Sequence, residues 1–239
     1  MTNEIKELQR TDEWFTIRNG RFTGSEMFKL MTGGKRDMTE QELIEYKAAN
    51  PKGTRKTIDV MFGETALSYI FSKSCDVVFG RDEEEQFVSQ DMLRGQMLEP
   101  IAFDKFKELK EAEFMTVEKT SFFVYGDNAG ASPDGLINKD AVLEIKAPRP
   151  PKFFKLVKDG YDAIDNEYII QMQTEILCTN SKRAHFFNYI IYNGVPMWHE
   201  IIVERDEEMI DEIKKRIDAA VAIRDQYVAE LRKNIQFEL

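Results

Sequence analysis

The sequence predicts an α/β fold in which a central mixed β-sheet is flanked by helices. Five segments have the apolar pattern and turn-bounded length of strands: 114–125, 129–137, 141–147, 184–192 and 197–204. The last two are joined by Asn193-Gly194, a dipeptide that strongly favours a tight hairpin turn. Helical patterns precede, separate and follow these strands, which is the order expected of a sheet covered by helices.

In the N-terminal half, four helices are expected, over 12–19, 25–31, 39–49 and 57–71. Ser25 is positioned to cap the second helix, and Thr39 with Glu42 forms a capping box for the third. The stretch between the second and fourth helices is rich in glycine and basic residues. We therefore expect a single domain over 1–239, with 34–59 as an excursion that is mobile or contacts a ligand or another subunit.

In the C-terminal half, a long helix is expected over about 86–109, followed by helices over 152–157 and 166–178. A last helix begins near Asp206. Its apolar residues recur at helical spacing and predict a core-facing stripe: Ile210, Ile213, Ile217, Val221, Val228 and Leu231.

The composition excludes several classes of protein. No apolar run approaches the length of a membrane span, and the first residues lack the pattern of a signal peptide, so a cytoplasmic protein is expected. Cys75 and Cys178 are isolated, which gives no support for an iron–sulfur cluster or a disulfide framework. With only His185 and His199 in the chain, a histidine-rich zinc site is also disfavoured.

The net charge of −10 argues at first sight against a nucleic-acid partner, but the charge is unevenly distributed. Five basic residues and no acidic ones lie between 146 and 158, and a second basic cluster lies between 29 and 56. Acidic residues are concentrated in 82–85 and 204–212. This pattern suits an enzyme that holds DNA and then lets it move, rather than a tight static binder.

The most informative stretch is Ser132-Pro133-Asp134-Gly135, followed by Glu144-Ile145-Lys146. Residues two apart in a strand point to the same face, so Glu144 and Lys146 should project together while Leu143 and Ile145 face the core. Two carboxylates and a lysine can hold Mg²⁺ on a phosphate and direct a water at it. A glutamate–lysine pair on a solvated edge strand is the alternative interpretation of the second motif alone.

Further groups could complete such a site. The backbone carbonyl of Ile145 could add a metal ligand, and Glu99 is the best third carboxylate because its helix is expected to bury Leu98, Ile101 and Phe103. The alternative interpretation is that Glu99 is an ordinary solvent-exposed glutamate on its helix. Lys146 could hold or deprotonate the attacking water and offset charge on the phosphate.

Two glutamines lie in the otherwise apolar helix that begins near residue 166. Gln171 and Gln173 are about 200° apart around a helix, so at most one can face the site. Gln171 shares a face with Tyr168 and is the preferred orienting group for water or phosphate, with Gln173 as the second choice.

Taken together, these motifs resemble the phage-lambda-type 5′→3′ exonucleases, the viral recombinase and alkaline nuclease branch of the PD-(D/E)XK nucleases. The similarity spans nearly the whole chain except 34–59. It is carried by the order and spacing of several short motifs: Trp14-Phe15-x-x-Arg18-x-Gly20-x-x-Thr23-x-Ser25-Glu26, Gly95-x-x-x-Glu99, Ser132-Pro133-Asp134-Gly135, Glu144-Ile145-Lys146, Tyr168-x-x-Gln171-x-Gln173 and Glu204-Arg205-Asp206. Thr174 departs from the pattern, because a tyrosine often occupies this position.

The resemblance implies a restriction-endonuclease-like core and a role for each matched residue. Asp134 and Glu144 would bind Mg²⁺, with Glu99 near a second metal and Mn²⁺ as a substitute. Lys146 would be the catalytic lysine and Gln171 a supporting residue. Arg18 would bind the 5′-phosphate, with Ser25 and Ser132 near the bound phosphate and Gln173 as a further substrate contact.

The expected activity is therefore digestion of linear double-stranded DNA in the 5′→3′ direction. The products would be 5′ mononucleotides and 3′ single-stranded tails for annealing-type recombination. The resemblance also implies a homotrimeric ring on DNA ends, a single-strand annealing protein as partner, and a phage-type protein acting in the cytoplasm of a bacterial host.

Two other functions are compatible with the same sequence. An endonuclease that is structure-specific or restriction-like would use the same centre on a different substrate. A DNA-binding module without catalysis would keep the fold, although such a module is expected to lose Asp134, Glu144 or Lys146, and all three are present.

Overall fold

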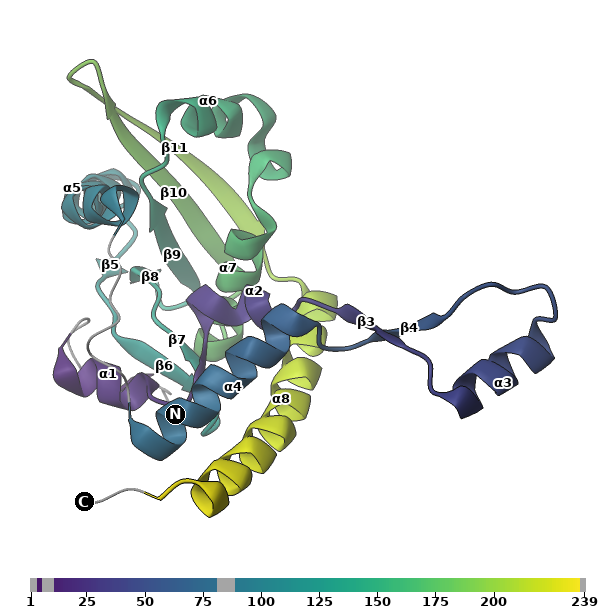
Figure 1. The fold of residues 1–239 in the computed structure, drawn as a ribbon. Helices are drawn as coiled ribbons and strands as arrows, with labels where there is room; N and C mark the ends of the chain where they lie inside the picture. The colour runs from purple at the N-terminus through teal and green to yellow at the C-terminus, as the bar shows by residue number, and fades with distance from the viewer. Residues whose placement is uncertain (1–3, 6–10, 81–88, 237–239) are drawn as a thin grey trace.

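The computed structural model describes residues 4–5, 11–80 and 89–236, and its centre is a five-stranded mixed sheet (Figure 1). The strand order is β11-β10-β9-β8-β5. The strands span Val117–Glu118 (β5), Gly135–Ile137 (β8), Ala141–Lys146 (β9), Arg183–Tyr192 (β10) and Val195–Glu204 (β11). Only β9 and β10 are parallel, while the other neighbours are antiparallel. The expected mixed sheet flanked by helices is confirmed.

Helices cover both faces of this sheet. Helix α5 (Gln90–Ala112) packs on one face, where Phe103 and Phe106 join Leu143, Ile145 and Phe187 in one buried cluster. Helix α7 (Asn166–Thr179) packs on the other face and belongs to a larger cluster with α4 (Glu64–Phe79) and α8 (Glu207–Asn234). Because strand side chains alternate, β9 contributes Leu143 and Ile145 to the first cluster and turns Glu144 to the opposite face.

A second sheet, in the order β1-β6-β7-β2, lies beside the first. Its strands are Glu4–Ile5 (β1), Phe22–Thr23 (β2), Phe122–Tyr125 (β6) and Ala129–Ala131 (β7). The expectation of single long strands over 114–125 and 129–137 was therefore wrong. Each of these segments breaks in the middle and passes from one sheet to the other. The Thr120 hydroxyl donates to the carbonyl of Pro133 at 2.7 Å and joins the two breaks.

The N-terminal helices differ in part from expectation. Helix α1 (Asp12–Arg18) is capped by Thr11, but Ser25 caps nothing, because it lies inside a 3₁₀ turn (Gly24–Glu26) that leads into α2 (Met27–Leu30). The segment 57–71 is not one helix: Thr57–Val60 is a strand, and α4 begins only at Glu64.

The excursion at 34–59 is an ordered arm (Figure 1). It consists of an antiparallel pair, β3 (Gly34–Asp37) and β4 (Thr57–Val60), with α3 (Glu40–Ala49) between them. The expected capping box of Thr39 and Glu42 is present. Helix α3 buries none of its residues, so the arm projects from the body rather than packing on it.

The C-terminal elements agree well with the sequence. The β10–β11 hairpin turns at Asn193 and Gly194, both with positive φ, and α8 buries Ile210, Ile213 and Ile217. Helix α6 (Pro150–Asp159) and a 3₁₀ turn (Gly160–Ala163) connect β9 to α7. The start predicted for the long helix, at residue 86, lies outside the described residues. None of the helices described here is long and apolar enough to span a membrane.

Candidate active site

Asp134 lies where the chain enters the five-stranded sheet, immediately before β8. Its backbone N–H donates to the carbonyl of Leu143, and its Oδ2 accepts a 2.7 Å hydrogen bond from the N–H of Ile145. Within a strand the N–H and C=O of one residue point to the same side. The carbonyl of Ile145 is therefore on the same edge of β9 as the Asp134 carboxylate. Two groups that are expected to bind the same metal thus lie side by side.

Glu144 and Lys146 project from β9 on the face that α7 covers. Glu144 is only 2% exposed, and its Oε1 is ion-paired with the Lys146 ammonium. The Lys146 Nζ also lies 4.8 Å from the centre of the Tyr168 ring. The solvated edge-strand interpretation of this pair is excluded, because β9 is an interior strand of its sheet.

Gln171 connects the strand to the helix. Its Nε2 donates to Oε1 of Glu144 at 2.7 Å and to Oε1 of Glu175 at 2.9 Å, while its Oε1 accepts from Lys146 at 3.4 Å. Glu175, one turn further along α7, is 1% exposed. A buried carboxylate beside two others was not expected from the sequence.

The electrostatics of this cluster follow from burial of like charges. Burial raises the pKa of the Asp134 carboxyl well above its usual range, and the charges of Glu144 and Glu99 raise it further. Burial and the charge of Glu144 likewise raise the pKa of Glu175. Burial alone would lower the pKa of Lys146, but Glu144 and Asp134 outweigh it and raise that pKa. Without a metal, these two carboxylates therefore keep Lys146 in its charged form.

Helix α5 brings Glu99 to the same place. Glu99 is half-buried and close enough to Asp134 to shift its pKa. The helix does not bury Ile101 as expected, since that side chain is 48% exposed, whereas Phe103 is buried. One turn before Glu99, Arg94 donates from Nη1 to the carbonyls of Ala147 and Pro148 and so fastens α5 to the loop that follows Lys146.

Arg18 contacts Ser132, which lies two residues before Asp134 in the chain. The hydroxyl of Ser132 accepts from Nε1 of Trp14 at 3.2 Å and from Nη1 of Arg18 at 3.4 Å. The guanidinium carbon of Arg18 lies 4.0 Å from the centre of the Trp14 ring, so stacking fixes the plane of the guanidinium. Ser25 is exposed in its 3₁₀ turn, which packs against β7 through Gly24.

Gln173 is not brought to this cluster. Its Nε2 donates to the carbonyl of Glu204 at 2.7 Å, and its Oε1 accepts from the N–H of Asp206 at 2.9 Å. Both ends of the amide are therefore used to join α7 to the junction of β11 and α8. The physical reason is the helical angle between Gln171 and Gln173, and a substrate contact from Gln173 is withdrawn.

The donor set fits a hard divalent cation. Among the residues that the structure describes, no three His, Cys, Asp or Glu side chains form a ready metal cage. Mg²⁺ does not require one, because it keeps several waters and binds through one or two carboxylates and substrate phosphates. The repulsion that raises the pKa of Asp134 is the kind of unfavourable energy that a cation between Asp134 and Glu144 would relieve.

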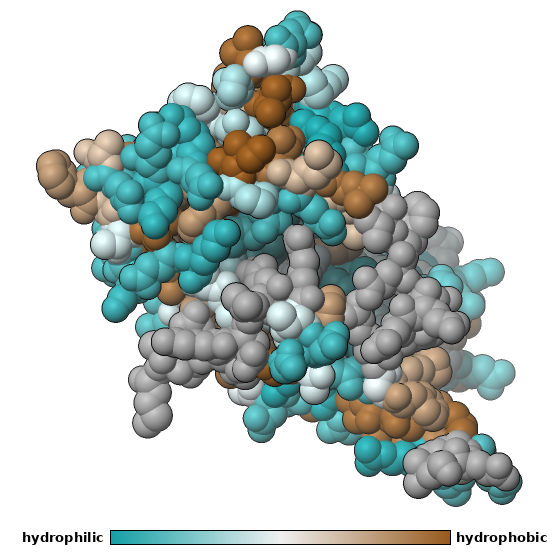
Figure 2. Space-filling view, turned by 90° about the vertical axis from the view of Figure 1, so that its left-hand side faces the viewer, coloured by the Kyte–Doolittle hydropathy of each residue, from teal (hydrophilic) through white to brown (hydrophobic). Residues whose placement is uncertain are grey.

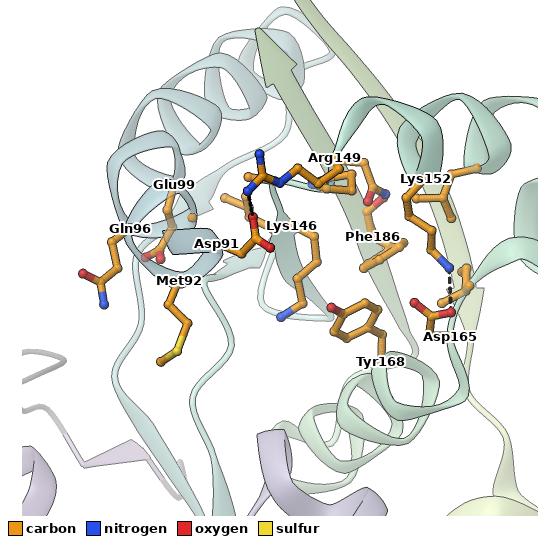
Figure 3. Close-up of a pocket in the computed structure, with 17 residues that line it drawn as sticks. Asp91, Met92, Gln96, Glu99, Lys146, Arg149, Lys152, Asp165, Tyr168 and Phe186 are labelled. Atoms are coloured by element: carbon orange, nitrogen blue, oxygen red, sulfur yellow. Dashed lines mark hydrogen bonds and ion pairs between the residues drawn. The ribbon is translucent and has the colours of Figure 1, made fainter. Parts of the chain in front are cut away.

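A cavity of about 530 Å³ opens beside Lys146 (Figure 3). Helix α5 forms one wall with Glu99 and Gln96, and the opposite wall is formed by Tyr168 and Phe186. At its rim, Arg149 is paired with Asp91 at 2.6 Å, and Lys152 with Asp165 at 2.6 Å. The cavity therefore lies next to Glu99 and Lys146, two members of the cluster.

Sequence reasoning missed three residues of this region: Arg94, Glu175 and Asn188. Glu175 had a detectable signal, since it lies four residues after Gln171 on an apolar helix. Asn188 and Arg94 gave none, because their positions depend on which strands and helices become neighbours.

The comparisons with known proteins agree with this geometry. The mixed sheet flanked by helices is a fold that this chain shares with a solved alkaline exonuclease. The profile of the YqaJ-like viral recombinase domain matches residues 13–182, more than half of the chain, and the protein belongs to this family. The family resemblance inferred from the motifs is confirmed, and membership supports a nuclease role. A search of curated protein sequences found no significant match.

Solved structures of two exonucleases are examples that share the fold. The alkaline exonuclease LHK-Exo from Laribacter hongkongensis, also solved in complex with dAMP, is 24% identical with a TM-score of 0.71, over 93% of this chain and 97% of that one. A phage-related exonuclease from Haemophilus somnus 129PT is 17% identical with a TM-score of 0.62, over 88% of this chain and 96% of that one.

The raised pKa of Glu175 predicts how stability depends on pH in the absence of metal. The folded protein holds a proton on Glu175 that the unfolded chain releases above the ordinary pKa of 4.5. Stability should therefore fall as pH rises from about 4.5 to the raised pKa, by about 1.4 kcal/mol per pH unit for one proton. Glu175→Gln should reduce this slope to the part that the raised pKa of Asp134 contributes, and it should raise the Tm at neutral pH, as measured by thermal unfolding in EDTA.

Glu167 supplies the matched control, because Glu167→Gln makes the same substitution at an exposed position of the same helix. An equal effect of the two substitutions on the pH slope would contradict the buried proton on Glu175.

Proposed function

We propose that this protein is a Mg²⁺-dependent 5′→3′ exonuclease that degrades one strand of linear double-stranded DNA. The observation that carries the proposal is the juxtaposition of two kinds of group. Arg18 and Ser132 can hold a terminal phosphate. Asp134 lies only two residues after Ser132 and forms a carboxylate cluster with Glu144 and Glu99. The membership of the viral recombinase family supports a nuclease that acts on DNA ends during recombination.

The residues divide the reaction between them. Asp134, Glu144 and the carbonyl of Ile145 would hold Mg²⁺, with Glu99 near a second ion. Bound there, the metal would polarise the scissile phosphate and lower the pKa of a water. The Lys146 ammonium offsets the negative charge that grows on the phosphate oxygens in the transition state. Gln171 keeps Glu144 and Lys146 in register through hydrogen bonds to both.

Arg18 sets the direction of digestion, because it binds the phosphate at the 5′ end of the strand. Its guanidinium offers several donors in a plane, which suits a terminal phosphate dianion, and stacking on Trp14 limits its motion. A strand whose 5′-phosphate is held there presents its first phosphodiester to Asp134 and Glu144. Cleavage then releases a 5′ mononucleotide and leaves the complementary strand as a 3′ tail.

The direct test is digestion of a linear duplex and a covalently closed circle in the presence of Mg²⁺ or Mn²⁺. We expect 5′ mononucleotides from the linear DNA and no cutting of the circle. Asp134→Asn and Lys146→Ala should each lower the cleavage rate at least about a hundredfold without unfolding the protein, because the first weakens a metal ligand and the second removes a cation that offsets charge in the transition state. A nicked circle would establish an endonuclease instead, and no cleavage by the folded wild type would leave a DNA-binding module.

Arg18 should determine the preference for a phosphorylated end. Arg18→Gln is expected to lower the ratio of kcat/KM for 5′-phosphate over 5′-hydroxyl ends by roughly 10- to 100-fold, the value of a charge-assisted hydrogen bond. Digestion of the two end-labelled duplexes gives this ratio. Arg21→Gln, three residues further along the chain but bonded to the carbonyl of Ile17, is the matched control. An unchanged ratio in Arg18→Gln would contradict the phosphate role.

We further propose that the protein acts as a homotrimeric ring with an annealing protein as partner, in the cytoplasm of a bacterial host. A ring would allow a chain of net charge −10 to stay on DNA by topology rather than by affinity. Exposed apolar side chains gather on the face that carries α5 and the end of the β10–β11 hairpin (Figure 2). They include Leu93, Met97, Ile101, Ile191 and Trp198. Such a patch is typical of an interface.

Light scattering after gel filtration tests the ring. We expect the molar mass of three chains, and Met97→Glu should shift it toward one chain because it places a charge in the centre of the apolar patch. Lys107→Glu, on the same helix but outside the patch, should leave the mass unchanged. A monomeric wild type at the assay concentration would contradict the ring.

A further inference from the structure

The arm of residues 34–59 is separate from the catalytic cluster but firmly attached to the body. None of the residues that line the cavity described above belongs to the arm. At its root, Nη1 of Arg216 on α8 donates to the carbonyl of Leu30 at 2.7 Å and to that of Met61 at 2.8 Å. These two carbonyls lie on either side of the arm in the chain, so one side chain of α8 holds the segments that enter and leave it. The arm therefore has a fixed direction.

Polar contacts, rather than a core, determine the shape of the arm. The guanidinium of Arg36 on β3 donates to both oxygens of Glu42 on α3, each at 2.7 Å, and Glu42 also completes the capping box with Thr39. At the other end of α3, the ring of Tyr46 packs on Gly53, where a Cβ atom would lie 2.5 Å from the tyrosine hydroxyl oxygen. The helix and the loop after it are thus held in one arrangement.

The outer end of the arm, formed by α3 and the loop after it, carries a basic segment (Figure 1). We call residues 47–56 the arm tip. In a chain of net charge −10, the arm tip contains no acidic residue and four exposed cations, Lys47, Lys52, Arg55 and Lys56. Arg55 pairs with Asp59 at 2.7 Å, but the three lysines form no ion pair with any other residue that the structure describes. Their charges are therefore available to an external anion.

The composition of the arm tip fits phosphate groups rather than the surface of another protein. Specific protein interfaces have an apolar centre rich in large side chains. The arm tip has no aromatic residue, and its only apolar side chains are those of Ala48, Ala49 and Pro51. Contact with a nucleic-acid backbone needs only cations and small polar groups, because it reads no base.

We infer that the arm tip binds the phosphate backbone of the duplex outside the catalytic cluster, through Lys47, Lys52 and Lys56. This inference rests on the proposed function, which makes double-stranded DNA the polyanion beside the protein. The contact requires neither a 5′ end nor a particular sequence. Since backbone contacts of this kind allow a protein to slide along DNA, the arm tip can retain the duplex between successive cleavages without stopping its movement.

The test measures binding in EDTA to a linear duplex with 5′-hydroxyl ends, which offer Arg18 no terminal phosphate. Each lysine that neutralises a phosphate contributes about 0.9 to the slope of log K against log salt concentration. The triple variant Lys47→Gln, Lys52→Gln and Lys56→Gln should therefore flatten this slope by roughly 2.7. From about 50 to about 200 mM salt, the wild type should lose roughly 40-fold more affinity than the variant. An unchanged slope would overturn the inference.

Lys139, Lys215 and Lys233 supply the matched control, because all three are exposed lysines of the body. Their replacement by glutamine removes the same charge and should change the slope by less than about one unit. Equal flattening by the two triple variants would mean that net charge alone matters, and would contradict a site at the arm tip. If the first triple variant does not fold, Lys52→Gln alone should still flatten the slope by about 0.9.

Kinetics with Mg²⁺ separate this inference from the proposed function. The arm-tip triple variant should keep the wild-type kcat, because it leaves the reacting groups intact, while its KM for a long duplex rises by at least about tenfold. Digestion of no DNA end by the wild type refutes the exonuclease, whereas digestion with the same KM and salt slope in both proteins refutes only the arm-tip site. A lower molar mass of the variant in light scattering would show that the tip binds a neighbouring subunit, and would overturn the inference.

Discussion

The structure depends on the burial of a charged strand residue, Glu144, between a β-sheet and a helix. A carboxylate that is 2% exposed is tolerated only with partners, and the neighbouring groups are arranged to supply them. Lys146 balances the charge, and Gln171 donates a hydrogen bond from α7. The position of α7 on the sheet is therefore set by polar contacts as well as by its apolar residues. The same contacts hold the reactive groups in place before any substrate arrives.

The path of the chain explains how Asp134 comes to face Glu144. The segment that contains Asp134 runs first in one sheet and then in the other, and Pro133 lies at the crossing. Proline lacks an N–H and cannot continue a ladder of hydrogen bonds, so the crossing is fixed at this point. Asp134 is the first residue after the crossing, where its carboxylate accepts a hydrogen bond from the N–H of Ile145. The Ser132-Pro133-Asp134-Gly135 motif therefore does two things: it moves the chain from one sheet to the other, and it places the Asp134 carboxylate beside β9.

The sequence was sufficient to predict those site residues whose relative positions depend on spacing within one strand or one helix. Glu144 and Lys146 are two apart in a strand, and Tyr168 and Gln171 share one helical face, so their neighbourhood follows from periodicity alone. Prediction from the sequence was wrong where contacts between distant segments determine the secondary structure. The strand over Thr57–Val60 exists because it pairs with Gly34–Asp37, and the two long strands break because a second sheet competes for them. Asn188 joins the site only because β10 lies parallel to β9, a pairing between distant segments.

The arm of residues 34–59 leaves and re-enters the body at almost one point. A Cβ atom on Gly34 would lie 2.6 Å from the Cα of Gly63, so the backbones touch where the arm begins and ends. The two ends of the arm are therefore as close together as the ends of a short loop, although the arm itself is long. For protein engineering this junction is a natural insertion point: a reporter or an affinity module with closely spaced ends could replace the arm while the sheets and their carboxylates keep their geometry.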